Sequence, residues 1–155
     1  MKLTASVDIH ASAERIWHVI SNIEQAGEVI EGIQSIEILK KADSEDGFTG
    51  LKWRETRTMF GKTATEVMWI TEAKANGFYR TQAESHGAIY KTLVKIDDTG
   101  SDDTHRLSYE FDGIPVTVGA KIAQFLLAPL FVGGTRKALQ KDLNDIKRAV
   151  ESQPA

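Results

Sequence analysis

The sequence predicts an α+β fold in which a curved, seven-stranded antiparallel sheet is wrapped around one long C-terminal helix. Two observations carry this prediction. Between about residues 114 and 151, apolar residues recur every three or four positions, which aligns them on one side of a long helix. Most of the preceding chain alternates apolar and polar residues between short turn signals, as antiparallel strands do. Packing the helix on the sheet would bury the apolar surface of both.

The N-terminal part of the chain predicts one strand followed by two short helices. Apolar and polar residues alternate from Leu3 to Ile9, which is typical of a strand. Ser12 is suited to cap a helix that begins after it, and the apolar residues from Ile16 to Ile23 would form its buried side. We expect Asn22 to interrupt this run, so that a second short helix continues to about Ile30.

Six further strands are expected before the long helix. They are separated by residues typical of turns, including Gly61, the Asn76-Gly77 pair and the His86-Gly87 pair. Tight turns of this kind join antiparallel neighbours, so the six strands are expected to form a meander. The expected ranges are 33–41, 51–60, 62–75, 78–85, 88–97 and 106–111.

Composition places the chain among ordinary globular proteins. Its 155 residues suit a single domain over 1–155, and a net charge of −3 gives no reason to expect a nucleic-acid partner. The absence of cysteine excludes disulfides and thiolate chemistry. No secretory signal is recognisable, and the most apolar run, Ile122 to Val132, is too short to span a membrane. We therefore expect a cytoplasmic protein without a membrane-spanning segment.

No motif for metal binding or nucleophilic catalysis is recognisable, so we expect no metal, no cofactor and no catalytic residue of these kinds. The four histidines lack the spacing of metal ligands, and no serine lies in a Gly-x-Ser-x-Gly context. Gly133-Gly134 is not preceded by a strand and is not followed by the Lys-Ser/Thr of a phosphate loop. These glycines are more typical of close packing or of a kink beside Pro129.

Three stretches resemble the START-like helix-grip superfamily, also called SRPBCC, which includes polyketide cyclase/dehydrase-like and Bet v 1-like proteins. The stretches are ASVDIHASAERIWHVISNIE, GLKWRETRTMFGKTATEVMWITEA and LAPLFVGGTRKALQKDLNDIKRAVE. The resemblance implies a cavity between sheet and helix that holds a lipid, sterol, polyketide or plant hormone, or in some members supports cyclisation or dehydration. One departure is SNIEQAGEVIEGI, which replaces the tryptophan-aspartate-proline turn of many relatives near the cavity entrance.

The strand over 51–60 supplies the first candidate ligand-binding residues. Alternation places Trp53, Glu55 and Arg57 on one face with Leu51 and Met59, and we expect this more apolar face to point inward. Arg57 could then meet a ligand carboxylate or enolate oxygen, while Glu55 could act as a base. The alternative interpretation is an ion pair at the rim or on the surface.

The strand expected over 62–75 supplies a further candidate ligand-binding residue and suggests a homodimer. Trp69 shares a face with Val67 and Thr71, and we count Trp69 among the ligand-binding candidates. Met68 and Ile70 on the opposite face are also apolar, so a second subunit could cover them.

The remaining candidates are three tyrosines and one part of the long helix. Tyr79, Tyr90 and Tyr109 lie on faces that alternation points inward, where their hydroxyls could orient a ligand oxygen or simply belong to the core. On the helix, a side formed by Val118, Ile122, Phe125, Leu126 and Leu130 would cover the ligand. The sequence thus favours binding of a small hydrophobic ligand. A polyketide aromatase/cyclase or dehydratase, or a ligand-free adaptor with a solid core, are the alternatives.

Overall fold

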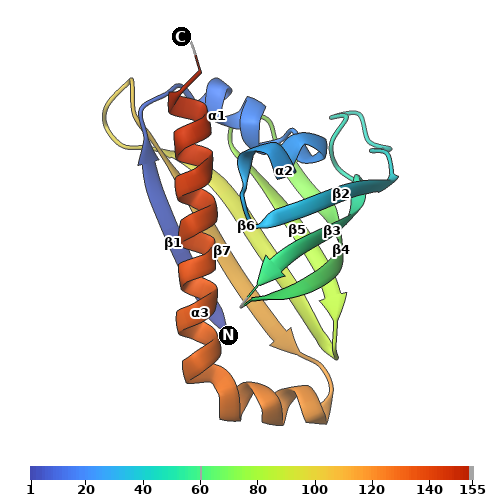
Figure 1. Cartoon of the computed structure of the whole chain (residues 1–155). Coiled ribbons are helices and arrows are strands. Elements are labelled where there is room, and N and C mark those ends of the chain that lie inside the picture. The colour runs from blue at the N-terminus through green and yellow to red at the C-terminus, as the bar shows by residue number, and fades with distance from the viewer. Residues whose placement is uncertain (60, 154–155) are drawn as a thin grey trace.

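Residues 1–59 and 61–153, which the computed structural model describes, form a seven-stranded antiparallel sheet and four helices, one of them a short 3-10 helix (Figure 1). For Met59 and residues 128–131 only the backbone is described. The strands are β1 (Lys2–Ile9), β2 (Ile33–Lys40), β3 (Lys52–Met59), β4 (Lys62–Lys74), β5 (Phe78–Ser85), β6 (Ala88–Asp98) and β7 (His105–Pro115). The helices are α1 (Ala13–Ile20), the 3-10 helix η1 (Ile23–Gln25), α2 (Ala26–Val29) and α3 (Val118–Glu151).

The strand order is β1-β7-β6-β5-β4-β3-β2, so strands two to seven form the predicted meander and β1 closes on β7. This confirms the predicted fold class. The predicted start of the long helix near Ile114 is wrong, because Ile114 and Pro115 pair with Ile89 and Ala88 of β6. Helix α3 begins only after Thr117, whose side-chain oxygen accepts a hydrogen bond from the Ala120 amide at 3.1 Å.

Helix α3 is bent. Its two segments, Val118–Leu127 and Val132–Glu151, lie at 84° to each other, and Pro129, which has no amide hydrogen to donate, is located between them. The second segment lies beside β1 and β7, whereas the first turns away at the lower end of the molecule in Figure 1. No single helix in residues 1–59 and 61–153 is both long and apolar enough to cross a membrane; the two segments of α3 meet that test only as a bent pair.

The core lies between the sheet, α1 and the second segment of α3. Ile9, Ile16, Leu107, Leu143 and Val150 are all fully buried there. In α1 the apolar residues recur at helical spacing, and Ser12 caps the helix as predicted, with its hydroxyl accepting from the Arg15 amide at 3.2 Å. The predicted interruption at Asn22 is also present, since α1 ends at Ile20 and η1 follows.

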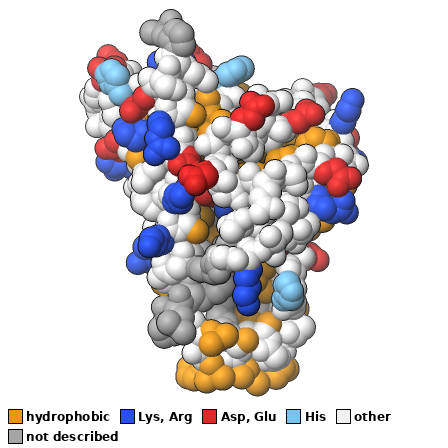
Figure 2. All heavy atoms as spheres, in the orientation of Figure 1, with side chains coloured by type: hydrophobic (Ala, Val, Ile, Leu, Met, Phe, Trp, Pro, Cys, Tyr) orange, Lys and Arg blue, Asp and Glu red, His pale blue; other side chains and the backbone are white. Residues whose placement is uncertain are grey.

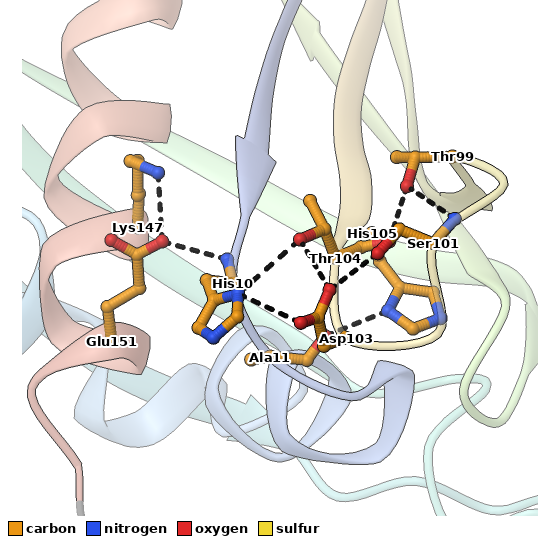
Figure 3. A network of polar contacts seen from close by, with 9 residues as sticks. All are labelled: His10, Ala11, Thr99, Ser101, Asp103, Thr104, His105, Lys147 and Glu151. Atoms are coloured by element: carbon orange, nitrogen blue, oxygen red, sulfur yellow. Dashed lines mark hydrogen bonds and ion pairs between the residues drawn. The ribbon is translucent and has the colours of Figure 1, made fainter.

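Polar contacts fix the C-terminal end of α3 to the turn between β1 and α1 (Figure 3). The His10 amide and the Lys147 ammonium both donate to the Glu151 carboxylate at 2.8 Å. Next to them, the His105 ring donates to the Ala11 carbonyl at 2.8 Å, which adds the start of β7 to the network. These contacts hold α1 and α3 together at one end of the sheet, where α1 contributes to the wall of a cavity.

Candidate functional site

A cavity of about 470 Å³ lies between the concave face of the sheet, the helices α1, η1 and α2, and the second segment of α3. Most of its lining is apolar, with residues such as Ile23, Val29, Met68, Val94 and Leu139 contributed by helices and strands. The volume is in the range of small-molecule sites in proteins. The polar lining residues are Glu55, Arg57, Glu66, Tyr79, Thr81, His86, Tyr90, Thr92, Tyr109, Thr135 and Asp142.

A buried charge cluster forms part of this wall. Arg57 Nε donates to Glu55 Oε1 at 2.7 Å, and an Arg57 terminal nitrogen donates to Asp142 Oδ2 at 3.0 Å. The second oxygen of Glu55 accepts from Trp53 Nε1 at 3.4 Å. Trp53, Glu55 and Arg57 alternate along β3 and so share its inward face, whereas Asp142 reaches them from α3. The cluster therefore links the sheet to the helix across the cavity wall.

The positive charge of Arg57 is compensated within the protein. Burial disfavours the charged form of Arg57, but the carboxylates of Glu55 and Asp142 more than offset this and raise the pKa of Arg57. Burial raises the pKa of Asp142, and the neighbouring guanidinium opposes that shift. Arg57 thus has two carboxylate partners inside the chain. The ion pair of Glu55 and Arg57 is present, but not on the open surface, since Glu55 and Asp142 are only 8% and 7% exposed.

The three tyrosines line the cavity at separate places. Tyr79 and Tyr109 are buried, and burial raises the pKa of both phenols. Tyr79 also packs edge-on against Phe48, with ring centroids 5.4 Å apart. Tyr90 is partly exposed and stacks on Phe111 at 5.7 Å. Their inward orientation matches the alternation of β5, β6 and β7, while their role toward a ligand stays a prediction.

Two polar lining atoms are buried without a hydrogen-bond partner among the residues that the structure describes. They are Glu66 Oε2 on β4 and Thr135 Oγ1 on α3. Thr135 is only 4% exposed. Burial raises the pKa of Glu66. His86 and Ser85 oppose this increase with smaller effects, and the Glu55 carboxylate adds the smallest contribution in the same direction as burial. An unpaired buried polar group is costly, so these two atoms are natural contacts for a bound molecule.

Sequence reasoning missed Glu66, Thr135 and Asp142. For Asp142 the signal was helical spacing, because it lies three residues after Leu139 and four before Ile146, both of which line the cavity. Asp142 therefore lies on the cavity side of α3, where it is only 7% exposed. For Glu66 the signal was hairpin register: partners across an antiparallel pair share a face, and Glu66 lies opposite Glu55.

Trp69 lies outside the cavity, contrary to prediction. The register pairs Trp53 with Met68, so Met68 faces inward with Trp53, and Trp69 points to the convex face. There the Lys52 ammonium lies over the indole ring, 5.7 Å from its centroid. Met68 lines the cavity and Ile70 is buried, which removes the reason given by the sequence for a subunit interface on them.

The helical residues expected to cover the ligand also lie elsewhere. Ile122, Phe125 and Leu126 are 55%, 84% and 67% exposed and do not line the cavity, and Val118 is exposed as well. The bend in α3 is the reason, since it turns the segment that carries them away from the sheet. Residues Thr135, Ala138, Leu139, Asp142 and Ile146 of the second segment line the cavity instead. Leu130 lies outside the residues whose side chains are described.

Comparison with known families gives one match over almost the whole chain. The profile of a family described as "Polyketide cyclase / dehydrase and lipid transport" matches residues 1–151. No curated protein sequence matches the chain significantly.

Several solved structures share the fold at low sequence identity. The protein TTHA0849 from Thermus thermophilus has a TM-score of 0.78 at 14% identity, over 97% of each chain. The ZhuI aromatase/cyclase from Streptomyces has a TM-score of 0.74 at 12% identity, over 97% of this chain and 93% of its own. Norcoclaurine synthase from Thalictrum flavum, in complex with dopamine and hydroxybenzaldehyde, has a TM-score of 0.73 at 16% identity, over 100% and 88%. At these identities the likeness concerns the fold.

Proposed function

Because the chain belongs to the polyketide cyclase/dehydrase and lipid transport family, we propose that its cavity binds a small hydrophobic molecule of lipid-like or polyketide-like chemistry. The ligand would lie between the concave face of the sheet and the second segment of α3. Trp53, Glu55, Arg57 and the three tyrosines, already on the cavity wall, would contact it.

The observation that carries this proposal is the cavity itself. A volume of about 470 Å³ with a mainly apolar lining and a few polar groups is the usual form of a small-molecule site. A closely packed core would leave no such space. The cavity therefore supports ligand binding over a ligand-free adaptor with a solid core.

A catalytic role as an aromatase/cyclase or dehydratase is the second candidate. It is favoured by the ionisable groups that share the cavity, because cyclisation and dehydration need groups that donate and accept protons. Tyr90→Phe removes one hydroxyl from the wall while keeping the ring. With a poly-β-keto substrate, an enzyme would lose turnover in this variant and keep most of its binding, whereas a carrier would lose affinity alone.

Native mass spectrometry of the purified protein, followed by organic extraction, tests the binding proposal. The expected result is a stoichiometric hydrophobic molecule in the wild-type protein. Ala138→Trp would place an indole inside the cavity, in the space meant for the ligand, and should abolish retention. Lys137→Trp is the matched control, because it places the same indole on an exposed neighbouring position of α3.

Two outcomes would contradict the proposal. One is retention of the same molecule by Ala138→Trp at the wild-type stoichiometry, which would place the binding site elsewhere on the protein. The other is a wild-type protein that carries nothing and shows no thermal shift across a panel of hydrophobic molecules.

A further inference from the structure

We propose that the ligand is uncharged and presents a carbonyl oxygen to Glu66 and Thr135, and that the cavity disfavours carboxylates. This inference rests on the proposed function, since it specifies the chemistry of a ligand in the same cavity. It follows from the buried charges of the lining and from its two unpartnered polar atoms.

The cavity wall already carries more acidic than basic buried side chains. Among the described lining residues, the Arg57 guanidinium faces two carboxylates, those of Glu55 and Asp142, with which it is hydrogen-bonded. Glu66 is a third acidic group on the same wall. A ligand carboxylate would add a negative charge where the strongest cation is already paired, and burying an unpaired charge is costly. A fatty acid is therefore a poor match for this cavity.

Glu66 is placed to act as a hydrogen-bond donor. It lies directly opposite Glu55 on the neighbouring strand, and both side chains face the cavity. Glu55 is satisfied by Arg57 and Trp53, whereas Glu66 Oε2 is buried without a partner among the described residues. Burial raises the pKa of Glu66 and favours its protonated form; His86 and Ser85 oppose this increase, and the Glu55 carboxylate adds only the smallest contribution to it. A protonated carboxyl can donate to a carbonyl oxygen.

Thr135 supplies a second, independent observation. Its side chain is buried on the second segment of α3, lines the same cavity, and has a hydroxyl without a partner among the described residues. A buried hydroxyl without a partner is stabilised when it can donate a hydrogen bond to a ligand oxygen. Glu66 on the sheet and Thr135 on the helix thus present hydrogen-bond donors from two walls to a ligand with an otherwise apolar body.

Three probes with the same bicyclic body separate the contributions: ethylnaphthalene, acetonaphthone and naphthoate. Equilibrium dialysis at mildly acidic pH should rank acetonaphthone first and naphthoate last. Glu66→Met and Thr135→Val should each weaken acetonaphthone by about 2- to 10-fold, as expected for one hydrogen bond, and leave ethylnaphthalene unchanged. Glu72→Gln, an exposed glutamate of the same strand, should change none of the three.

The pH profile adds a signature that a purely structural role would not produce. Acetonaphthone affinity should fall as pH rises through the titration of Glu66, because the carboxylate can no longer donate. In Glu66→Gln, whose amide donates at every pH, the profile should be flat. The groups that face Glu66 are Glu55, Ser85, His86 and Tyr90, so the profile is repeated in His86→Gln to separate it from imidazole titration.

The outcomes distinguish this inference from the proposed function. If ethylnaphthalene and acetonaphthone bind equally well, or naphthoate binds best, the inference fails while the cavity remains a hydrophobic site. If none of the three probes binds, the proposed function is contradicted, and the inference, which depends on it, is contradicted as well. A ketone preference that is lost in Glu66→Met and kept in Glu66→Gln supports it.

Discussion

Arg57 is the residue on which the charged part of the cavity wall depends. Its guanidinium is the shared partner of Glu55 and Asp142, two carboxylates that are nearly inaccessible to solvent. In such a cluster, removal of the central charge leaves two buried anions without compensation. The stability of the fold and the polarity of the cavity are therefore coupled at this one side chain.

We expect Arg57→Met to lower the free energy of unfolding by roughly 3–5 kcal/mol, the usual cost of leaving a buried charge unpaired. Arg54→Met is the matched control on the same strand. Arg54 forms an exposed ion pair with Glu37 on the convex side, so its loss should cost only about 0–1 kcal/mol. Urea denaturation of both variants measures the difference. Equal effects for the two arginines would show that the buried cluster does not contribute as described.

The raised pKa of Glu66 predicts that the stability difference between wild type and Glu66→Gln depends on pH. Because burial raises its pKa above the ordinary value of 4.5, the native state holds a proton that the unfolded chain releases more readily. The contribution of this group is complete below the unfolded pKa and is lost as pH rises through the folded pKa. Glu66→Gln should therefore gain stability relative to wild type as pH rises above about 4.5, the ordinary value, until Glu66 is ionised in the folded protein as well. A difference in melting temperature that stays constant over this range would contradict the assignment.

At the scale of elements, α3 is one helix with two different environments. The second segment, Val132–Glu151, buries Leu143, Ile146 and Val150 against the sheet and α1. The first segment, Val118–Leu127, leaves its large apolar side chains in solvent. One continuous apolar pattern in the sequence therefore contributes to two different surfaces. The part in the second segment is buried in the core, and the part in the first segment is exposed.

Matched leucine substitutions on the two segments test this division. Leu143→Ala should cost about 2–5 kcal/mol of unfolding free energy, because Leu143 is fully buried. Measured on dilute, monomeric protein, Leu126→Ala should stay within roughly 0.5 kcal/mol, because Leu126 is 67% exposed in the monomer. Thermal or urea denaturation provides the comparison. A large loss in Leu126→Ala would mean that the first segment packs against the core in solution.

At the scale of the whole molecule, one end is unusually apolar. Figure 2 shows hydrophobic side chains gathered at the lower end of the molecule, where the first segment of α3 lies. The exposed large apolar residues here are Ile114, Val116, Val118, Ile122, Phe125, Leu126 and Leu127. Contiguous apolar surface of this kind usually marks an interaction site. It gives a reason for self-association that replaces the one suggested by Met68 and Ile70.

We therefore expect a homodimer through this apolar end. Sedimentation velocity should show a dimer at tens of micromolar, roughly the range in which specific dimers persist. Phe125→Ser combined with Leu126→Ser should shift the protein to a monomer without loss of secondary structure. Leu39→Ser, an exposed apolar residue on β2, is the control and should leave the dimer intact. A monomeric wild-type protein at this concentration would rule the interface out.

The sequence predicted the elements well because local chemistry specifies them. Alternation predicted the strands and the inward side chains of Trp53, Glu55 and Arg57, and the Ser12 cap predicted the start of α1. The match of the family profile to residues 1–151 likewise confirms the resemblance to the superfamily. Trp69 was misplaced because both faces of β4 carry apolar residues, so alternation alone could not decide which face is inside.

The sequence by itself determined the fold class and the order of its elements, because periodicity, caps and turns act between near neighbours in the chain. Only the tertiary structure decided which residues form the site. It brought Asp142 to Arg57 across 85 residues of chain, set Glu66 opposite Glu55, and turned Phe125 away from the cavity through the bend in α3. These outcomes depend on register and on the direction of a helix, which are set by packing between distant segments.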